Sequence, residues 1–295
     1  MKRSIKMAVS EKVLMAVIYL VMILFCLCVI GPFMNIIAVS FSGRNAVTSG
    51  RVSLWPVDFN VEAYKKVLTT QYFGRAYLNT VLIVLAGTPL SLAVTVLMAY
   101  PLSRSDLPGK RALTFILTLT MWFSGGMIPS FILVNKLGLY DSYWALILPG
   151  LVSAYNIIIV RNFFAQTPVS LEESAKLDGA GEMTVLVRIF LPLSLPVLAT
   201  ITLWLVVGYW NTYLSALLYL STRAKYTLQL VLREIVIADS LDQYLGIDPV
   251  DNATRTVTES IKYANILLTI LPIMCVYPFL QRFFMKGVLL GAVKG

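Results

Sequence analysis

Long apolar stretches set the strongest limit on what this chain can fold into. Six of them approach or exceed the length of about 20 residues that a helix needs to cross roughly 30 Å of hydrocarbon. They lie near residues 13–39, 77–100, 112–133, 142–161, 193–218 and 263–281. They lack the alternation over about ten residues that marks the strands of a membrane barrel. Because hydrocarbon satisfies no backbone polar groups, the sequence predicts an all-α integral membrane protein with six transmembrane helices in a single domain, 1–295.

The composition supports a membrane environment. Of the 295 residues, 58% are hydrophobic and 13% are charged, which is more apolar surface than a soluble domain of this size buries. The net charge of +9 is spread over Lys and Arg residues that stand singly or in pairs between the apolar stretches. A nucleic-acid site would instead gather them in a basic stripe. We therefore expect a partner in membrane lipid and none in nucleic acid.

The basic residues also predict the orientation of the chain. They precede the first stretch at positions 2, 3, 6 and 12, occupy the short loop 101–111 and follow the last stretch at 282, 286 and 294. Short basic loops stay in the cytoplasm, so both termini are expected on the cytoplasmic side of a bacterial cell membrane, with 42–76 and 219–262 outside. The stretch 13–41 is about twice as long as the apolar region of a cleavable signal and is expected to remain as an anchor.

The chain has few of the residues that enzymes commonly use for catalysis. The chain contains no histidine, and Cys26, Cys28 and Cys275 lie inside apolar stretches, where thiols usually serve as packing residues. A membrane-embedded hydrolase or transferase remains a competing hypothesis. Its only acidic cluster would be Glu172, Glu173, Asp178 and Glu182. We interpret Glu172 and Glu182 as charges on a solvated face and expect no enzyme activity from this chain.

The segment 167–192 between the fourth and fifth stretches has a distinctive local pattern. Ser170 and Glu173 have the spacing of a capping box, which would begin a short helix, and Gly179 is placed to end that helix in a left-handed conformation. A second short helix would then run toward Pro192. The sequence therefore predicts a bent pair of short cytoplasmic helices between two spans.

The same segment resembles a known family motif. Glu173-Ser174-Ala175, then Gly179, then Ile189-x-Leu191-Pro192 is similar to the EAA motif in permeases of binding-protein-dependent (type I) ABC importers, with Ser174 in place of the usual Ala. Asn79-Thr80, Trp210-Asn211 and the glycine-rich 287–295 resemble the maltose-type smaller permease of the carbohydrate branch. Residues 121–129 resemble oligosaccharide permeases related to the lipoprotein/polyuronate type.

The resemblance implies a division of labour. The motif helix, called the coupling helix in this family, docks on a cytoplasmic ATPase subunit, while the cytoplasmic tail 283–295 inserts between two such subunits. The residues implied at the ATPase are Glu173, Ser174, Ala175, Asp178, Gly179 and Ala180. ATP and Mg would be bound by the partner, with no cofactor on this chain, which lacks the P-loop motif G-x-x-x-x-G-K-[ST]. The resemblance implies that the complete importer comprises two unlike permease subunits, two ATPase subunits and an external sugar-binding protein.

The expected translocation path is neutral. The spans contain hydroxyl and amide side chains and no clear acid or base in mid-membrane, which suits a hydroxylated solute and not a proton-coupled carrier. Aromatic rings beside amides are suited to stacking on sugars, so the candidate lining residues are Trp122, Tyr209, Trp210 and Asn211. Helix packing explains the same residues equally simply. An importer of a non-sugar solute and a channel without ATP coupling remain the alternatives.

Overall fold

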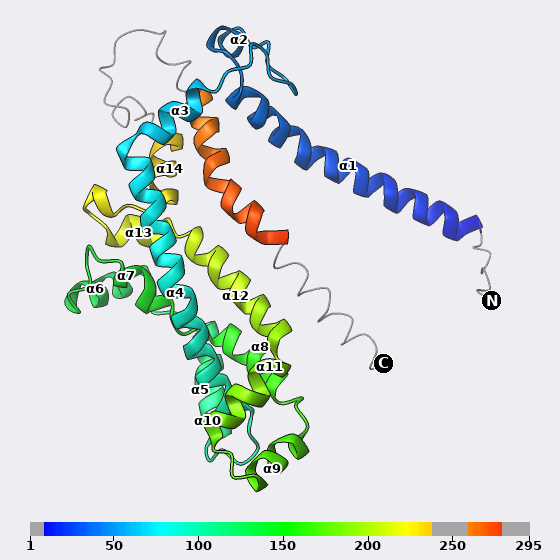
Figure 1. Ribbon diagram of the computed structural model, residues 1–295, viewed down its shortest axis with the longest axis vertical. Coiled ribbons are helices and arrows are strands. Elements are labelled where there is room, and N and C mark those ends of the chain that lie inside the picture. Colours follow the sequence, from blue (N-terminus) through cyan, green and yellow to red (C-terminus); the bar gives the residue numbers. More distant parts are fainter. Residues whose placement is uncertain (1–8, 238–258, 279–295) are drawn as a thin grey trace. The chain divides into compact units, whose positions relative to one another are not determined.

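The computed structural model describes residues 9–237 and 259–278, and the expected tail 283–295 lies outside them (Figure 1). Within these two ranges every regular element is a helix, which confirms the predicted fold class. The chain divides into two compact units. One comprises Met1–Thr70 and Asp239–Leu268, and the other comprises Gln71–Ala238 and Thr269–Gly295.

The first unit contains α1 (Val9–Ser40), α2 (Arg44–Thr48) and α3 (Glu62–Thr69). Residues 13–30 of α1 are apolar and exposed around the whole circumference of the helix, as expected of a helix surrounded by lipid. Helix α3 is amphipathic and buries Ala63 and Val67. Phe41 at the end of α1 stacks on Tyr64, with ring centroids 4.6 Å apart, so the segment after α1 is ordered.

The second unit is built on α4 (Gln71–Ser103), which packs against α8 (Ala154–Phe164) and α12 (Leu195–Trp210) (Figure 1). Ile157, Val160 and Ile201 are fully buried between these helices. Helices α4 and α12 approach closely at Gly87, where a Cβ atom would lie 2.6 Å from the Tyr209 ring. The three helices form a scaffold with the segment 167–192, which we call the coupling segment, at one end (Figure 1).

Three of the expected spans contain a sharp bend. Helices α5 (Lys110–Trp122) and α6 (Met127–Lys136) meet at 111°, and Gly126, directly before α6, adopts a positive φ of 85°. The pair formed by α7 (Trp144–Ile147) with η1 (Leu148–Gly150) and then α8 bends by 48°. The third bend, of 84°, lies at Ser194, before α12.

The helix lengths fit up to six membrane crossings. Helices α1, α4 and Glu259–Pro278 are each long and apolar enough to span alone, and each bent pair is long enough if it counts as one span. The expected stretch 193–218 is interrupted at residues 211–213, before α13 (Leu214–Tyr219). The exact span boundaries stay a prediction.

At the end of α12 away from the coupling segment, Asp141 joins two loops. Its carboxylate accepts hydrogen bonds from the backbone of Ser221 and Thr222, each at 3.0 Å, and from Lys225 Nζ at 2.8 Å. Burial works against the charged form, but these hydrogen bonds outweigh it and lower the pKa of Asp141. They fix the loop between α6 and α7 to the loop that leads through η3 (Arg223–Lys225) to α14 (Leu228–Ile237).

Candidate functional site

The first short helix of the coupling segment is α9 (Val169–Leu177). The predicted capping box is wrong. The helix begins at Val169, directly after Pro168, so Ser170 lies inside the first turn and no side chain caps the helix. Pro168 explains the shift, because its fixed φ and missing N–H suit it to the entry of a helix, and its carbonyl oxygen accepts from Leu171 N at 3.2 Å.

The end of α9 is as predicted. Gly179 has a positive φ of 83°. Its N–H donates to Lys176 O at 3.0 Å, and Ala180 N–H donates to Ala175 O at 2.9 Å. This pair of bonds is the Schellman arrangement, in which a left-handed residue closes the last turn and satisfies two free carbonyl groups. The chain then turns into α10 (Glu182–Val185), followed by the π-helical turn η2 (Leu186–Phe190) and α11 (Leu191–Leu193).

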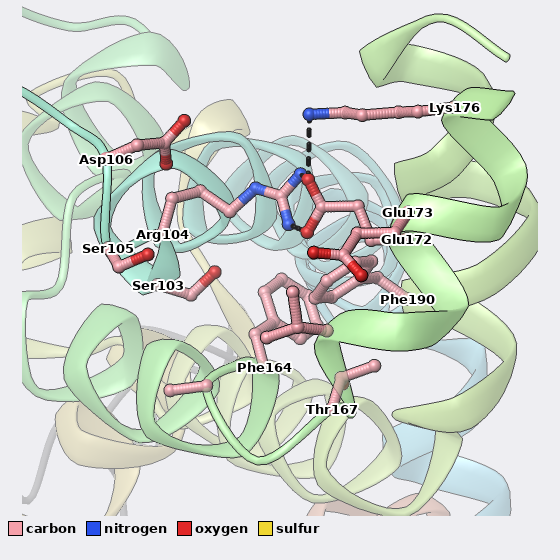
Figure 2. A pocket seen from close by; sticks show the side chains of 12 residues that line it. Ser103, Arg104, Ser105, Asp106, Phe164, Thr167, Glu172, Glu173, Lys176 and Phe190 are labelled. Atoms are coloured by element: carbon pink, nitrogen blue, oxygen red, sulfur yellow. Dashed lines mark hydrogen bonds and ion pairs between the residues drawn. The ribbon is translucent and has the colours of Figure 1, made fainter. Parts of the chain in front are cut away.

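Five side chains tie α9 and α10 to the end of α4, and we call them the Arg104 cluster; Figure 2 shows Arg104, Glu172 and Lys176. Arg104 forms ion pairs with Glu172 and, at 3.2 Å, with Glu182. Lys176 bridges the same two carboxylates at 2.8 and 2.7 Å. Tyr100 on α4 donates to Glu182 Oε2 at 2.6 Å. The cluster therefore holds α9, α10 and α4 together by alternating charges.

The cluster is partly shielded from solvent. The Arg104 and Glu172 side chains are 13% and 14% exposed, and the guanidinium lies over the rings of Tyr100 and Phe190 at 4.8 and 5.4 Å from their centroids. The interpretation of Glu172 as a solvated charge is therefore wrong, because Glu172 faces inward onto Arg104. Glu182 is more exposed, but it too is paired and not free on the surface.

The hydrogen bonds around Glu182 favour its charged form. The bond from Lys176 contributes most and the bond from Tyr100 comes next, and together with Arg104 they lower the pKa of Glu182 to about 2. At neutral pH the carboxylate is ionised and available to both cations. The electrostatic tie between α9 and α10 is therefore complete under physiological conditions.

A hollow of about 350 Å³ opens beside the cluster, between the loop after α4 and the inner face of α9. Figure 2 shows Arg104 reaching across it toward Glu172, with Phe164 and Phe190 beneath. Phe164 and Phe190 are almost fully buried and pack edge to face, 5.5 Å between centroids. This aromatic floor joins the coupling segment to the core of α4, α8 and α12.

The predicted ATPase-coupling residues occupy two faces of the segment. Glu173, Ser174, Asp178 and Gly179 are exposed. Ala175 and Ala180 are half-buried and pack against the main hydrophobic core, where a larger side chain would push the segment away. Leu177, one turn after Glu173, is 89% exposed. The segment thus has an anchored inner face and an open outer face that combines apolar and acidic groups.

The candidate pathway residues differ in their surroundings. Trp122 is exposed at the end of α5. Tyr209 and Trp210 are buried in helix contacts: Tyr209 Oη lies 2.8 Å from Ser91 Oγ, and Trp210 Nε1 donates to Thr269 O at 3.1 Å. Asn211 is exposed and accepts from Gln229 Nε2 at 3.1 Å. The structure does not bring these four side chains together at one surface of α12, and their lining role stays a prediction.

Sequence reasoning missed an exposed aromatic pair. Tyr155 of α8 and Trp204 of α12 stack with ring centroids 5.8 Å apart, and both rings are about half exposed. Trp204, Gly208 and Asn211 follow a spacing of four and three residues, so they share one face of α12. That spacing relative to Asn211 was the signal that could have singled out Trp204.

The chain belongs to the family described as binding-protein-dependent transport system inner membrane component, whose model matches residues 73–289. It is 45% identical to the polygalacturonan/rhamnogalacturonan transport system permease protein YtcP of Bacillus subtilis (strain 168), over 94% of this chain and 97% of that protein. It is 45% identical to Protein LplC of the same organism, over 90% and 89%.

Comparison with solved structures agrees on the fold. A chain of a bacterial ABC transporter involved in the import of the acidic polysaccharide alginate superposes with a TM-score of 0.87 at 33% identity, covering 95% of this chain and all of that one. A chain of an alginate transporter in complex with its pentasaccharide-bound periplasmic protein superposes at 0.60 with 14% identity, which shows the fold alone. The resemblance to type I importer permeases is thereby confirmed.

Proposed function

We propose that this chain forms one half of the membrane pathway of an ATP-driven importer for an oligosaccharide. The other half is a second, unlike permease subunit, and an external binding protein delivers the solute. Two cytoplasmic ATPase subunits bind ATP and Mg and drive transport through α9. Both termini of this chain lie in the cytoplasm, as the basic residues of its short loops indicate.

One observation carries this proposal: the two faces of α9 have opposite properties. On the inner face, Glu172 is paired with Arg104 and therefore with the scaffold helix α4. On the outer face Leu177 is 89% exposed, and Glu173, one helical turn before it, is exposed at the rim of the hollow. A nearly fully exposed leucine at the tip of a firmly anchored helix suits docking into a protein groove. Movement of the docked helix would then reach α4 and α12 through the cluster.

An oligosaccharide is the solute class that the observations favour. YtcP is named as a polygalacturonan/rhamnogalacturonan permease, and a further relative, 28% identical over its whole length, as the maltodextrin permease MalD of Streptococcus pneumoniae. The exposed stack of Tyr155 and Trp204 offers ring faces of the kind on which sugars pack. Asn211, on the same helix face as Trp204, offers amide hydrogen bonds to hydroxyl groups.

The proposal is tested by purifying the chain in detergent together with a partner permease and ATPase subunits that are expressed with it. A stable complex whose ATPase rate rises when loaded binding protein is added is the expected result. The complex in vesicles should take up oligosaccharide only with ATP. Uptake without ATP would favour a channel, and absence of the ATPase from the purified complex would contradict the proposal.

A further inference from the structure

The end of α12 away from the coupling segment carries a hollow that the coupling role does not use. Its volume is about 350 Å³, and it is lined by Tyr213, Gln229, Leu232, Arg233 and Val236. Tyr213 comes from the turn after α12 and the other four residues from α14. Gln229, Arg233 and Val236 are spaced by four and three residues, so they line one side of α14.

Helix α14 is held firmly, so this side is presented in a fixed position. Leu228 N–H donates to Thr80 Oγ1 of α4 at 2.8 Å. Thr227 Oγ1, just before α14, donates to Thr212 O after α12 at 2.9 Å. The opposite side of α14 is buried through Val231 and Ile235. The wall of the hollow is therefore preformed and needs little ordering when a ligand binds.

Two arginines near this end of the unit differ in their partners. Arg223 lies over the Tyr72 ring at 4.7 Å and pairs with Glu234 at 3.8 Å, so its charge is already used within the chain. Arg233 is half-buried, and its guanidinium has neither an ion pair nor a hydrogen bond among residues 9–237 and 259–278. A partly desolvated guanidinium that faces a hollow suits a carboxylate, which it can hold through two parallel hydrogen bonds.

The neighbours of Arg233 suit the rest of a sugar. Tyr213 is 43% exposed and offers an aromatic face for a pyranose ring. Gln229 donates to Asn211 at 3.1 Å, and this amide pair at the same end of α12 has further donor and acceptor positions for ring hydroxyls. A neutral sugar would satisfy the amides and the ring but leave Arg233 without a counter-ion among the residues that the structure describes.

We propose that this hollow binds a uronate residue of an acidic oligosaccharide as the solute enters the membrane pathway. Arg233 pairs with the carboxylate, and the Tyr213 ring packs against the sugar ring. Gln229 and Asn211 form hydrogen bonds with the hydroxyl groups. The inference rests on the proposed function, which places this end of α12 on the external side. It narrows the solute from oligosaccharides in general to those that carry carboxylates.

The test uses the complete importer, with its binding protein and ATPase subunits, in vesicles of phosphatidylcholine alone, so that no anionic lipid competes for Arg233. Uptake of labelled trigalacturonate is measured. Arg233→Gln should lower kcat/KM by about tenfold or more, the effect of losing one charge-assisted pair. Arg233→Lys should give an intermediate value, because it keeps the charge without the planar fork. Lys136→Gln removes the same charge from an exposed side chain outside the hollow and should match the wild type.

Several outcomes would overturn the inference. Wild-type uptake by Arg233→Gln, or an equal fall in Lys136→Gln, would show that Arg233 does not act on the solute. Loss of the assembled complex in Arg233→Gln would make Arg233 a subunit contact. Wild-type vesicles that take up maltotriose but not trigalacturonate would leave the proposed function intact and remove the acidic assignment. Uptake of neither sugar with ATP would instead contradict the proposed function.

Discussion

Arg104, directly after α4, and Glu172, in the first turn of α9, form an ion pair between positions 68 residues apart in the chain. Each side chain is less than 15% exposed. The pair therefore lies where water screens it weakly, and it joins α9 to α4, the longest helix among the described residues of the second unit. It gives the coupling segment a defined mechanical connection to the spans.

Removing Arg104 should loosen the coupling segment. Arg104→Gln leaves Glu172 partly buried with only Lys176, and we expect a loss of roughly 1–3 kcal/mol in the local stability of 169–193. Hydrogen exchange of this segment measures the loss. In the double variant with Glu172→Gln, the two losses should be clearly less than additive, because the same contact is removed twice. Full additivity would show that the two side chains do not act as a pair.

Glu172 and Glu173 are a matched pair of neighbouring carboxylates with different tasks. Glu172→Gln should reduce hydrogen-exchange protection of α9, because its partners Arg104 and Lys176 lie within the chain. Glu173→Gln should leave this protection unchanged and weaken ATPase attachment, because Glu173 is exposed and caps nothing. Copurified ATPase is the readout. Normal attachment in Glu173→Gln would remove the interfacial role of this charge.

Gly179 tests the bend and the outer surface separately. A Cβ at Gly179 would meet no atom within 4 Å, so the cost of a side chain there is its positive φ, about 1 kcal/mol. Among residues with a side chain, asparagine adopts this conformation most readily, so the Gly179→Asn variant should transport at a reduced rate. Gly179→Asp adds an anion to the same backbone and should block uptake while the protein remains inserted. Equal uptake by the two variants would show that charge at this position is unimportant.

The contribution of Glu182 should depend on pH in a defined direction. Its pKa is lowered from 4.5 to about 2, so its stabilisation is fully present above pH 4.5 and is lost as the pH falls toward 2. Protection factors of 182–185 should therefore stay constant from pH 8 to 5 and fall below about pH 4. Glu182→Gln should lose the part of this dependence that Glu182 contributes. A fall between pH 7 and 5 in the wild type would contradict the assignment.

Local patterns predicted the coupling segment well where neighbouring residues decide its conformation. The end of α9 at Gly179 was predictable because a helix commonly ends at a glycine in the left-handed conformation. The start of α9 was predicted wrongly because two local signals compete, and Pro168 determines the first turn before Ser170 can cap it. The Arg104 cluster was not predictable, because its members come from distant segments that only the packing of α4, α8 and α12 brings together.

The sequence also did not predict which sides of the apolar helices face the protein interior. Helix α12 is apolar on nearly all sides, so no periodic pattern shows that Tyr209 and Trp210 face inward while Trp204 is exposed. The bend at Gly126 was more accessible, since two adjacent glycines interrupt an apolar stretch there. Its angle of 111° depends on backbone torsions that composition does not specify.

The most direct test of the account is cross-linking from Leu177. In a background without Cys26, Cys28 and Cys275, Leu177→Cys should cross-link to the ATPase subunit in the assembled importer, because Leu177 is 89% exposed at the tip of α9. Leu137→Cys, at a leucine that is 62% exposed directly after α6, is the control and should give no such product. The expected result is a cross-link from position 177 alone. An assembled, ATP-hydrolysing complex that cross-links from 137 and not from 177 would contradict it.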